Sequence, residues 1–179
     1  MNCAPGSPSP LPTFCSLLLG QLLVPMPKPL PMAAAGVYQA GETQAQDVAL
    51  LRRHKVTHVL SIGARGPTDA DDIDNLRIGL PHSDDADLLG HLPQCLEYRH
   101  KAVHRGGVVL VHCKAGICRS AAVAAAYLMT VDPTLDPISA VQLLRRNTGR
   151  PCVNPSAEFM DQLAVFHEQM QKAAQQPSQ

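Results

Sequence analysis

The sequence predicts an α/β domain in which a central mixed, largely parallel sheet is flanked by helices. Two observations lead to this fold class. Short β-branched runs bounded by turn residues alternate with longer segments whose apolar residues recur at helical spacing. The length of 179 residues suits one such domain with short extensions. No internal repeat is visible.

The first half of the domain is predicted to begin with a helix followed by a strand. Thr43 and Gln46 have the spacing of a capping box, and the helix that they open is expected to end near His54. The run VTHVLSI, Val56–Ile62, is apolar and β-branched, which is typical of a buried strand.

A polar, Asp-rich stretch then predicts a loop over Gly63–Asn75, with a short strand at Leu76–Leu80. Apolar residues at helical spacing predict a helix over Asp87–His104. Because proline lacks the backbone N–H that a helix needs, Pro93 is expected to kink this helix or restart it.

The second half contains one strand and three helices. Val108–Val111 is a continuous apolar strand, and the Ala-rich run Ser120–Thr130 is helical. Asp136 and the proline after it open a helix that closes near Gly149, and Asn154 with Pro155 is expected to open the last helix in the same way. Four apolar residues then line one face of that helix: Phe159, Leu163, Phe166 and Met170.

The composition indicates where the domain begins and ends, and it argues against some classes of binding partner. Eight of the 16 prolines lie within the first 31 residues, so we expect a disordered leader at 1–32, the domain at 33–172 and a disordered tail at 173–179. Positive and negative charges balance, aromatic residues make up 3%, and tryptophan is absent. Broad nucleic-acid binding is therefore not expected. The apolar run Phe14–Val24 is too short to span a bilayer, so no membrane insertion is expected.

The six cysteines are irregularly spaced and form no zinc-ligand pattern. Neither a disulfide framework nor a metal or other cofactor is expected. A reducing compartment follows, which means a cytoplasmic or nuclear location.

Residues 108–120, VVLVHCKAGICRS, carry the clearest chemical signal. A buried strand ends at His112, a tight loop follows, and a helix begins at Arg119 or Ser120. Loop amides at a helix N-terminus converge on one small cup, which is an anion site. We expect the cup to bind phosphate through this set of residues: His112, Lys114, Ala115, Gly116, Ile117, Cys118 and Arg119.

Three side chains of this stretch have the types that phosphate-ester chemistry needs, and a fourth supports them. Helix dipole and amides would hold Cys113 as a nucleophilic thiolate, and Arg119 offers a planar fork for two phosphate oxygens. Ser120 can donate a hydrogen bond to the departing sulfur. His112 is expected to order the loop and to bias Cys113 toward thiolate.

The stretch HCKAGICRS resembles the signature loop of the cysteine-dependent protein tyrosine phosphatases, and the surrounding chain resembles the small, atypical dual-specificity phosphatases. The resemblance covers roughly residues 36–170. It implies a two-step displacement with no metal, in which Cys113 takes the phosphoryl group of phosphotyrosine, phosphoserine or phosphothreonine and water then hydrolyses the cysteinyl-phosphate. Four segments carry it besides the loop: Lys55–Ile62, Asp87–Cys95, Ala125–Met129 and Arg150–Leu163.

The resemblance also implies a general acid, an Asp just before the helix near Asp87. A gap-free alignment puts His82 at that place, whereas a loop shifted by two residues puts Asp84 there, with Asp85 one further on. We expect Asp84 to be the acid, with Asp85 second and His82 third. The competing interpretation is that the two aspartates only cap the helix.

Several positions depart from the family pattern. Cys118 replaces the usual Ser, which is either a tolerated exchange or a partner for a disulfide with Cys113 on oxidation. Ser156 and Glu158 stand where the family often has Asn and Gly that brace the loop. Lys114 is similar to the lysine of inositol-phospholipid phosphatases, although a solvated lysine at the rim is the simpler interpretation.

The predicted partner is thus a phosphorylated protein. Dual specificity is expected because no long insertion builds a deep phosphotyrosine wall. Two alternatives stay open. One is an enzyme for a non-protein phosphate ester, such as a phosphoinositide or the 5′ end of RNA, and the other is a weakly active phosphate-binding adaptor.

Overall fold

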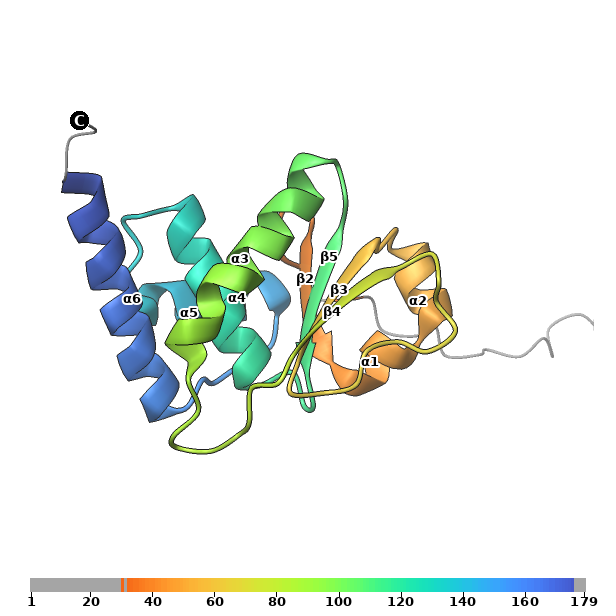
Figure 1. Ribbon diagram of the computed structural model, residues 1–179, viewed down its shortest axis with the longest axis horizontal. Helices are drawn as coiled ribbons and strands as arrows, with labels where there is room; N and C mark the ends of the chain where they lie inside the picture. The colour runs from red at the N-terminus through yellow and green to blue at the C-terminus, as the bar shows by residue number, and fades with distance from the viewer. Residues whose placement is uncertain (1–29, 31, 176–179) are drawn as a thin grey trace, which may run out of the picture.

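The computed structural model describes residue 30 and residues 32–175, and it places a five-stranded sheet between two layers of helices (Figure 1). The described part of the chain contains these strands: β1 Met32–Ala34, β2 Val37–Gly41, β3 His58–Ile62, β4 Asp74–Ile78 and β5 Val109–Cys113. It contains these helices: α1 Glu42–Gln46, α2 Val48–Arg53, α3 Leu88–His104, α4 Arg119–Val131, α5 Pro137–Thr148 and α6 Ala157–Gln175.

The strand order is β1-β2-β5-β3-β4, and only the edge pair β1–β2 is antiparallel. The predicted mixed, largely parallel sheet is therefore confirmed. β5 lies in the centre, where every residue from Val109 to Cys113 is buried. Its last residue pairs with Gly41 at the end of β2, so Cys113 reaches the edge where the parallel strands terminate. That edge is where α/β sheets place their ligand sites.

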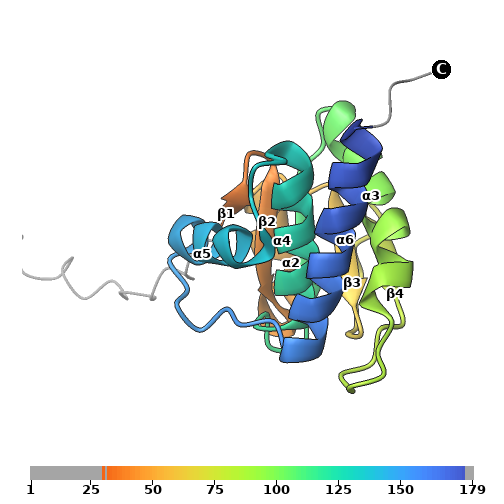
Figure 2. The ribbon, with the colours of Figure 1, turned by 90° about the vertical axis from the view of Figure 1, so that its left-hand side faces the viewer.

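Each face of the sheet has its own apolar core. α1 and α2 cover one face, and the longer helices α3 to α6 cover the other (Figure 1). α4 lies against the sheet and is buried over most of its length because its alanines allow close approach from all sides. Figure 2 shows α6 running alongside α3 in front of the sheet, so that α4 is enclosed by helices.

The helix predicted from Thr43 to His54 is broken into two. Asp47 separates α1 from α2 because its carboxylate accepts the N–H of Leu50 at 2.9 Å and so opens a new helix. The predicted capping box was wrong. The chain turns at Gly41, whose N–H donates to Gln44 at 3.2 Å, while Gln46 reaches the carbonyl of Gly66 at 2.8 Å.

The strand boundaries shifted, and two strands were missed. β3 begins at His58, two residues later than predicted, and β4 begins at Asp74, inside the predicted loop. β1 and β2 went unpredicted because Ala- and Gly-rich segments have low β-propensity. Pairing with the buried β5 overrides that propensity in β2.

α3 begins after Asp87, which accepts the N–H of Gly90 at 2.8 Å, and continues as one helix through Pro93 without restarting. α5 has the predicted Asp136 cap, with a 2.7 Å bond from Ser139, and ends at Gly149 with φ 63°. Asn154 does not open α6, which begins at Ala157.

At the two ends, the described chain extends beyond the predicted domain limits. Leu30 is buried and Met32 belongs to β1, although both fall in the predicted leader. α6 continues to Gln175, into the predicted tail, and its residues there are exposed. The other leader and tail residues lie outside the described chain. Within residue 30 and residues 32–175, no helix is long and apolar enough to cross a membrane.

Candidate active site

The loop that joins β5 to α4 forms a tight turn over the end of β2. Cys113 closes β5 with 2% of its surface exposed, and α4 starts six residues later at Arg119. Gly116 adopts φ 67°, and a Cβ there would lie 2.4 Å from the backbone of Ala40. Both the backbone angle and the close approach require glycine at this position.

The Cys113 thiol sits where several donors converge. Burial raises its pKa, but the Ser120 hydroxyl, at 3.3 Å from the sulfur, and the backbone N–H groups of Ser120, Gly116 and Ile117 lower it. The hydrogen bonds outweigh burial, so the pKa of Cys113 lies below its ordinary value. These contacts thus stabilise the anionic form of the sulfur, which is the nucleophilic form.

Arg119 is held by one nitrogen and keeps another unpaired. Its Nη1 donates to the carbonyls of Gly63, at 2.9 Å, and Leu80, at 3.2 Å, which fixes the guanidinium plane. Its Nε is buried and has no hydrogen-bond partner among the residues that the structure describes. A buried N–H without an acceptor costs free energy, so this donor calls for an anion in the loop.

His112 is fully buried behind the loop. Its Nε2 lies 2.7 Å from the hydroxyl of Ser61, which donates to Asn75 at 2.9 Å. Burial lowers the pKa of His112 to about 4, so the ring is neutral near pH 7. The His112 ring therefore ties the end of β5 to β3 through Ser61, and it carries no positive charge that would favour the Cys113 thiolate. Its role in ordering the loop stays a prediction.

The segment before α6 braces the loop through its backbone. The N–H of Asn154 donates to the carbonyl of Ile117 at 2.8 Å, and the N–H of Ser156 donates to the sulfur of Cys118 at 3.3 Å. Replacement of the family's Asn by Ser156 therefore leaves a main-chain brace in place. Burial raises the pKa of Cys118, so this second cysteine is favoured as a neutral thiol.

Lys114 points out of the loop rather than into it. Its ammonium group pairs with Glu42 at 2.7 Å, and this contact lowers the pKa of the Glu42 carboxyl. The Lys114 side chain is 70% exposed. This geometry fits the rim lysine of the simpler interpretation.

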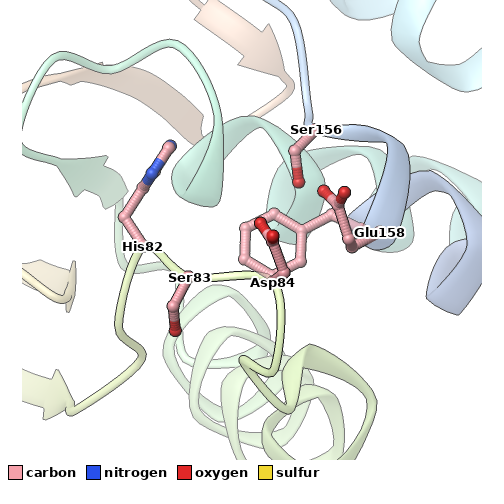
Figure 3. A pocket seen from close by; sticks show the side chains of 6 residues that line it. His82, Ser83, Asp84, Ser156 and Glu158 are labelled. Atoms are coloured by element: carbon pink, nitrogen blue, oxygen red, sulfur yellow. The ribbon is translucent and has the colours of Figure 1, made fainter.

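The candidate acids lie on the loop before α3. His82 and Asp84 both line a small pocket at the start of α6, and Asp85 does not. In Figure 3, Asp84 comes together with Ser156 and Glu158, while His82 stands at the other side of the pocket. Asp87 is the N-cap of α3. The competing interpretation, in which Asp84 and Asp85 only cap this helix, is therefore wrong.

Sequence reasoning missed two residues that contact the loop. Gln39 on β2 binds Gly116 and Ser120, and Arg150 after α5 binds Gln39 and Ala115. The sequence offered no local signal for either residue, because β2 itself was not predicted. Among the residues that the structure describes, no group of three His, Cys, Asp or Glu side chains could hold a metal ion.

The central strand of this largely parallel sheet ends at a cysteine, and an arginine lies at the end of the anion-binding loop that follows. This combination of fold and site is typical of the cysteine-dependent phosphatases. Residues 37–169 match the family model described as "Dual specificity phosphatase, catalytic domain". The chain belongs to this family, and its predicted fold class and resemblance are thereby confirmed.

The individual relatives agree with the family match. The chain is 35% identical over 124 residues to dual specificity protein phosphatase 19 of Mus musculus, covering 68% of this chain and 54% of the relative. The chain thus spans about half the length of that protein. Human DUSP28 has a similar crystal structure, with TM-score 0.72, 32% identity and coverage of 82% of this chain and 98% of that one.

A mouse putative dual specificity phosphatase, solved as a complex with zinc tungstate, is also similar. The TM-score is 0.76 at 28% identity, with coverage of 90% of this chain and 99% of that one.

Proposed function

We propose that this chain is a protein phosphatase that hydrolyses phosphotyrosine and phosphoserine or phosphothreonine through a cysteinyl-phosphate. The observation that carries the proposal is that one loop holds both a nucleophilic sulfur and a buried N–H donor without an acceptor. The loop stabilises the anionic form of the Cys113 sulfur, and the buried Nε of Arg119 has no acceptor within the described part of the chain. A phosphoryl group bound in the loop would give the Arg119 Nε its acceptor and would place its phosphorus next to the Cys113 sulfur.

In the first step the Cys113 sulfur attacks phosphorus, an S–P bond forms, and the P–O bond to the substrate breaks. The leaving oxygen takes a proton from the general acid, which we place at Asp84. Arg119 and the loop amides hold the three equatorial oxygens, and Nη1 keeps its bonds to Gly63 and Leu80 throughout.

In the second step water attacks the same phosphorus and gives a proton to the carboxylate of Asp84. The S–P bond breaks, phosphate leaves, and the sulfur returns as thiolate. The Ser120 hydroxyl, which already contacts Sγ at 3.3 Å, stabilises that departing anion.

Protein substrates are favoured over the non-protein esters. A phosphoinositide or an RNA end carries further phosphates, which call for free cations around the cup. Lys114 is engaged by Glu42, and the balanced charge of the chain supplies no broad positive field. The intact Cys113 and Arg119 likewise favour an enzyme over a phosphate-binding adaptor.

The proposed location is the cytoplasm or nucleus. The structure describes four cysteines, all of them free thiols: Cys95, Cys113, Cys118 and Cys152. The nucleophile must stay reduced to react, and a reducing compartment keeps it so.

Asp84→Asn tests the general acid. We expect the turnover of a phosphothreonine peptide, whose alkyl leaving group needs a proton, to fall by about 10²-fold or more. Turnover of an aryl phosphate with a good leaving group, such as p-nitrophenyl phosphate, should fall much less. Steady-state kinetics on both substrates measures the difference.

Asp85→Asn and His82→Asn are the matched comparisons, because both alter the same loop. We expect neither to show the selective loss on the peptide. A selective loss that is confined to Asp85→Asn or to His82→Asn contradicts the assignment to Asp84 and transfers the role to that residue.

A further inference from the structure

Gln39 is a fully buried polar residue on β2, in a strand whose other inward residues are apolar. Its Nε2 donates one hydrogen bond to the carbonyl of Gly116 at 2.8 Å and a second to the hydroxyl oxygen of Ser120 at 2.9 Å. Both amide hydrogens therefore end on the loop that carries the nucleophile. Burying an amide is costly unless its bonds are made, so this placement depends on the loop.

Arg150 decides which way the Gln39 amide faces. Its Nη1 lies 2.9 Å from Oε1 of Gln39, and its Nη2 donates to the carbonyl of Ala115 at 3.3 Å. A guanidinium group has donors only, so the amide atom that faces it must be the oxygen. The NH₂ group of Gln39 is thereby directed toward Ser120 and cannot exchange places with the oxygen.

The fixed orientation of the Gln39 amide in turn fixes the orientation of the Ser120 hydroxyl. Its oxygen accepts from Gln39, so its single hydrogen is left for another acceptor. The Cys113 sulfur lies 3.3 Å away and is that acceptor. We propose that Gln39, oriented by Arg150, is a positioning residue that fixes the Ser120 hydroxyl as a hydrogen-bond donor to the Cys113 sulfur.

This role deepens the proposed function and rests on it. A thiolate needs the donor twice, as the attacking anion and as the leaving anion of the second step. A serine that were free to rotate could instead donate to a nearby carbonyl and leave the sulfur without it. The chain from Arg150 through Gln39 to Ser120 removes that freedom before substrate arrives.

The test measures the pKa of the Cys113 thiol from the pH dependence of its alkylation by iodoacetamide. Ser120→Ala should raise this pKa by about 1 unit, and Gln39→Leu by about half a unit. The double variant should match Ser120→Ala alone, because Gln39 acts through the hydroxyl that is already missing. Thermal unfolding checks that each variant is folded.

Gln39→Glu provides a second reading that does not depend on the Leu variant folding. A carboxylate beside Arg150 would accept the Ser120 hydrogen and draw it away from the sulfur, so the thiol pKa should rise more than in Gln39→Leu. Gln171→Leu is the matched control, since the Gln171 amide binds Pro133 at 2.9 Å on the outside of α6. That control should leave the pKa unchanged.

Two results overturn the proposal. One is an unchanged thiol pKa in folded Gln39→Leu or Gln39→Glu. The other is a rise in Gln39→Leu that recurs in full on the Ser120→Ala background. Turnover of p-nitrophenyl phosphate by the unaltered protein is measured in parallel, because its absence refutes the proposed function and leaves the thiol titration to judge Gln39 separately.

Discussion

Cys113→Ser is expected to reduce the turnover of p-nitrophenyl phosphate by at least about 10³-fold. The serine hydroxyl stays protonated near neutral pH, so the loop would hold a poor nucleophile where it now favours a thiolate. Removing the nucleophile also removes the cysteinyl-phosphate, and the remaining loop cannot perform the displacement by another route.

The Cys113→Ser variant should lose turnover but keep its ability to bind the anion. Arg119 and the loop amides remain, so phosphate or tungstate should still bind to Cys113→Ser, which isothermal calorimetry can measure. Cys152→Ser is the matched control because Cys152 is an exposed free thiol outside the loop. Turnover that survives in Cys113→Ser, or falls equally in Cys152→Ser, contradicts the assignment of the nucleophile.

Arg119→Lys is expected to lower kcat/KM by about 10² to 10³-fold. Lysine keeps the charge but has no planar fork, so it cannot hold Gly63 and Leu80 while offering a second nitrogen to phosphate. The loss should appear mainly in kcat, because the guanidinium meets the oxygens most fully in the transition state.

Arg146→Lys is the control for this substitution, since Arg146 is exposed on α5. It should retain full activity. If Arg119→Lys keeps kcat and changes only KM, Arg119 contributes uniform binding rather than transition-state stabilisation, and the role proposed for its free Nε is wrong.

The loop could be predicted because its parts are consecutive in the chain. Cys113, Gly116, Arg119 and Ser120 lie within eight residues, so one short pattern contains nucleophile, turn, cation and donor. Gln39 and Arg150 lie 111 positions apart and meet only after β2 pairs with β5. No local pattern joins such residues, which is why the support of the loop became visible only in the fold.

The same distinction explains which elements were predicted. α4 and α5 follow from local signals, namely an alanine-rich run and an Asp cap followed by proline. β2 has weak local propensity and is a strand because its neighbour β5 supplies the pairing. Asp47 was passed over because its effect depends on whether its side chain caps a new helix or remains in solvent.

We expect the β5–α4 loop to hold Cys113 as a thiolate near neutral pH. The most direct measurement is the rate of iodoacetate alkylation of Cys113 against pH, followed by mass spectrometry of the cysteine peptides. Cys95 supplies an internal contrast, because burial raises its pKa to about 12 and it should react very slowly.

We expect the Cys113 rate to rise through a midpoint below the value of about 8.5 for an ordinary cysteine and to be constant above it. Phosphate or tungstate should protect this thiol by filling the loop. A midpoint at or above the ordinary value, with no protection by either anion, would show that the loop neither lowers the pKa of Cys113 nor binds phosphate.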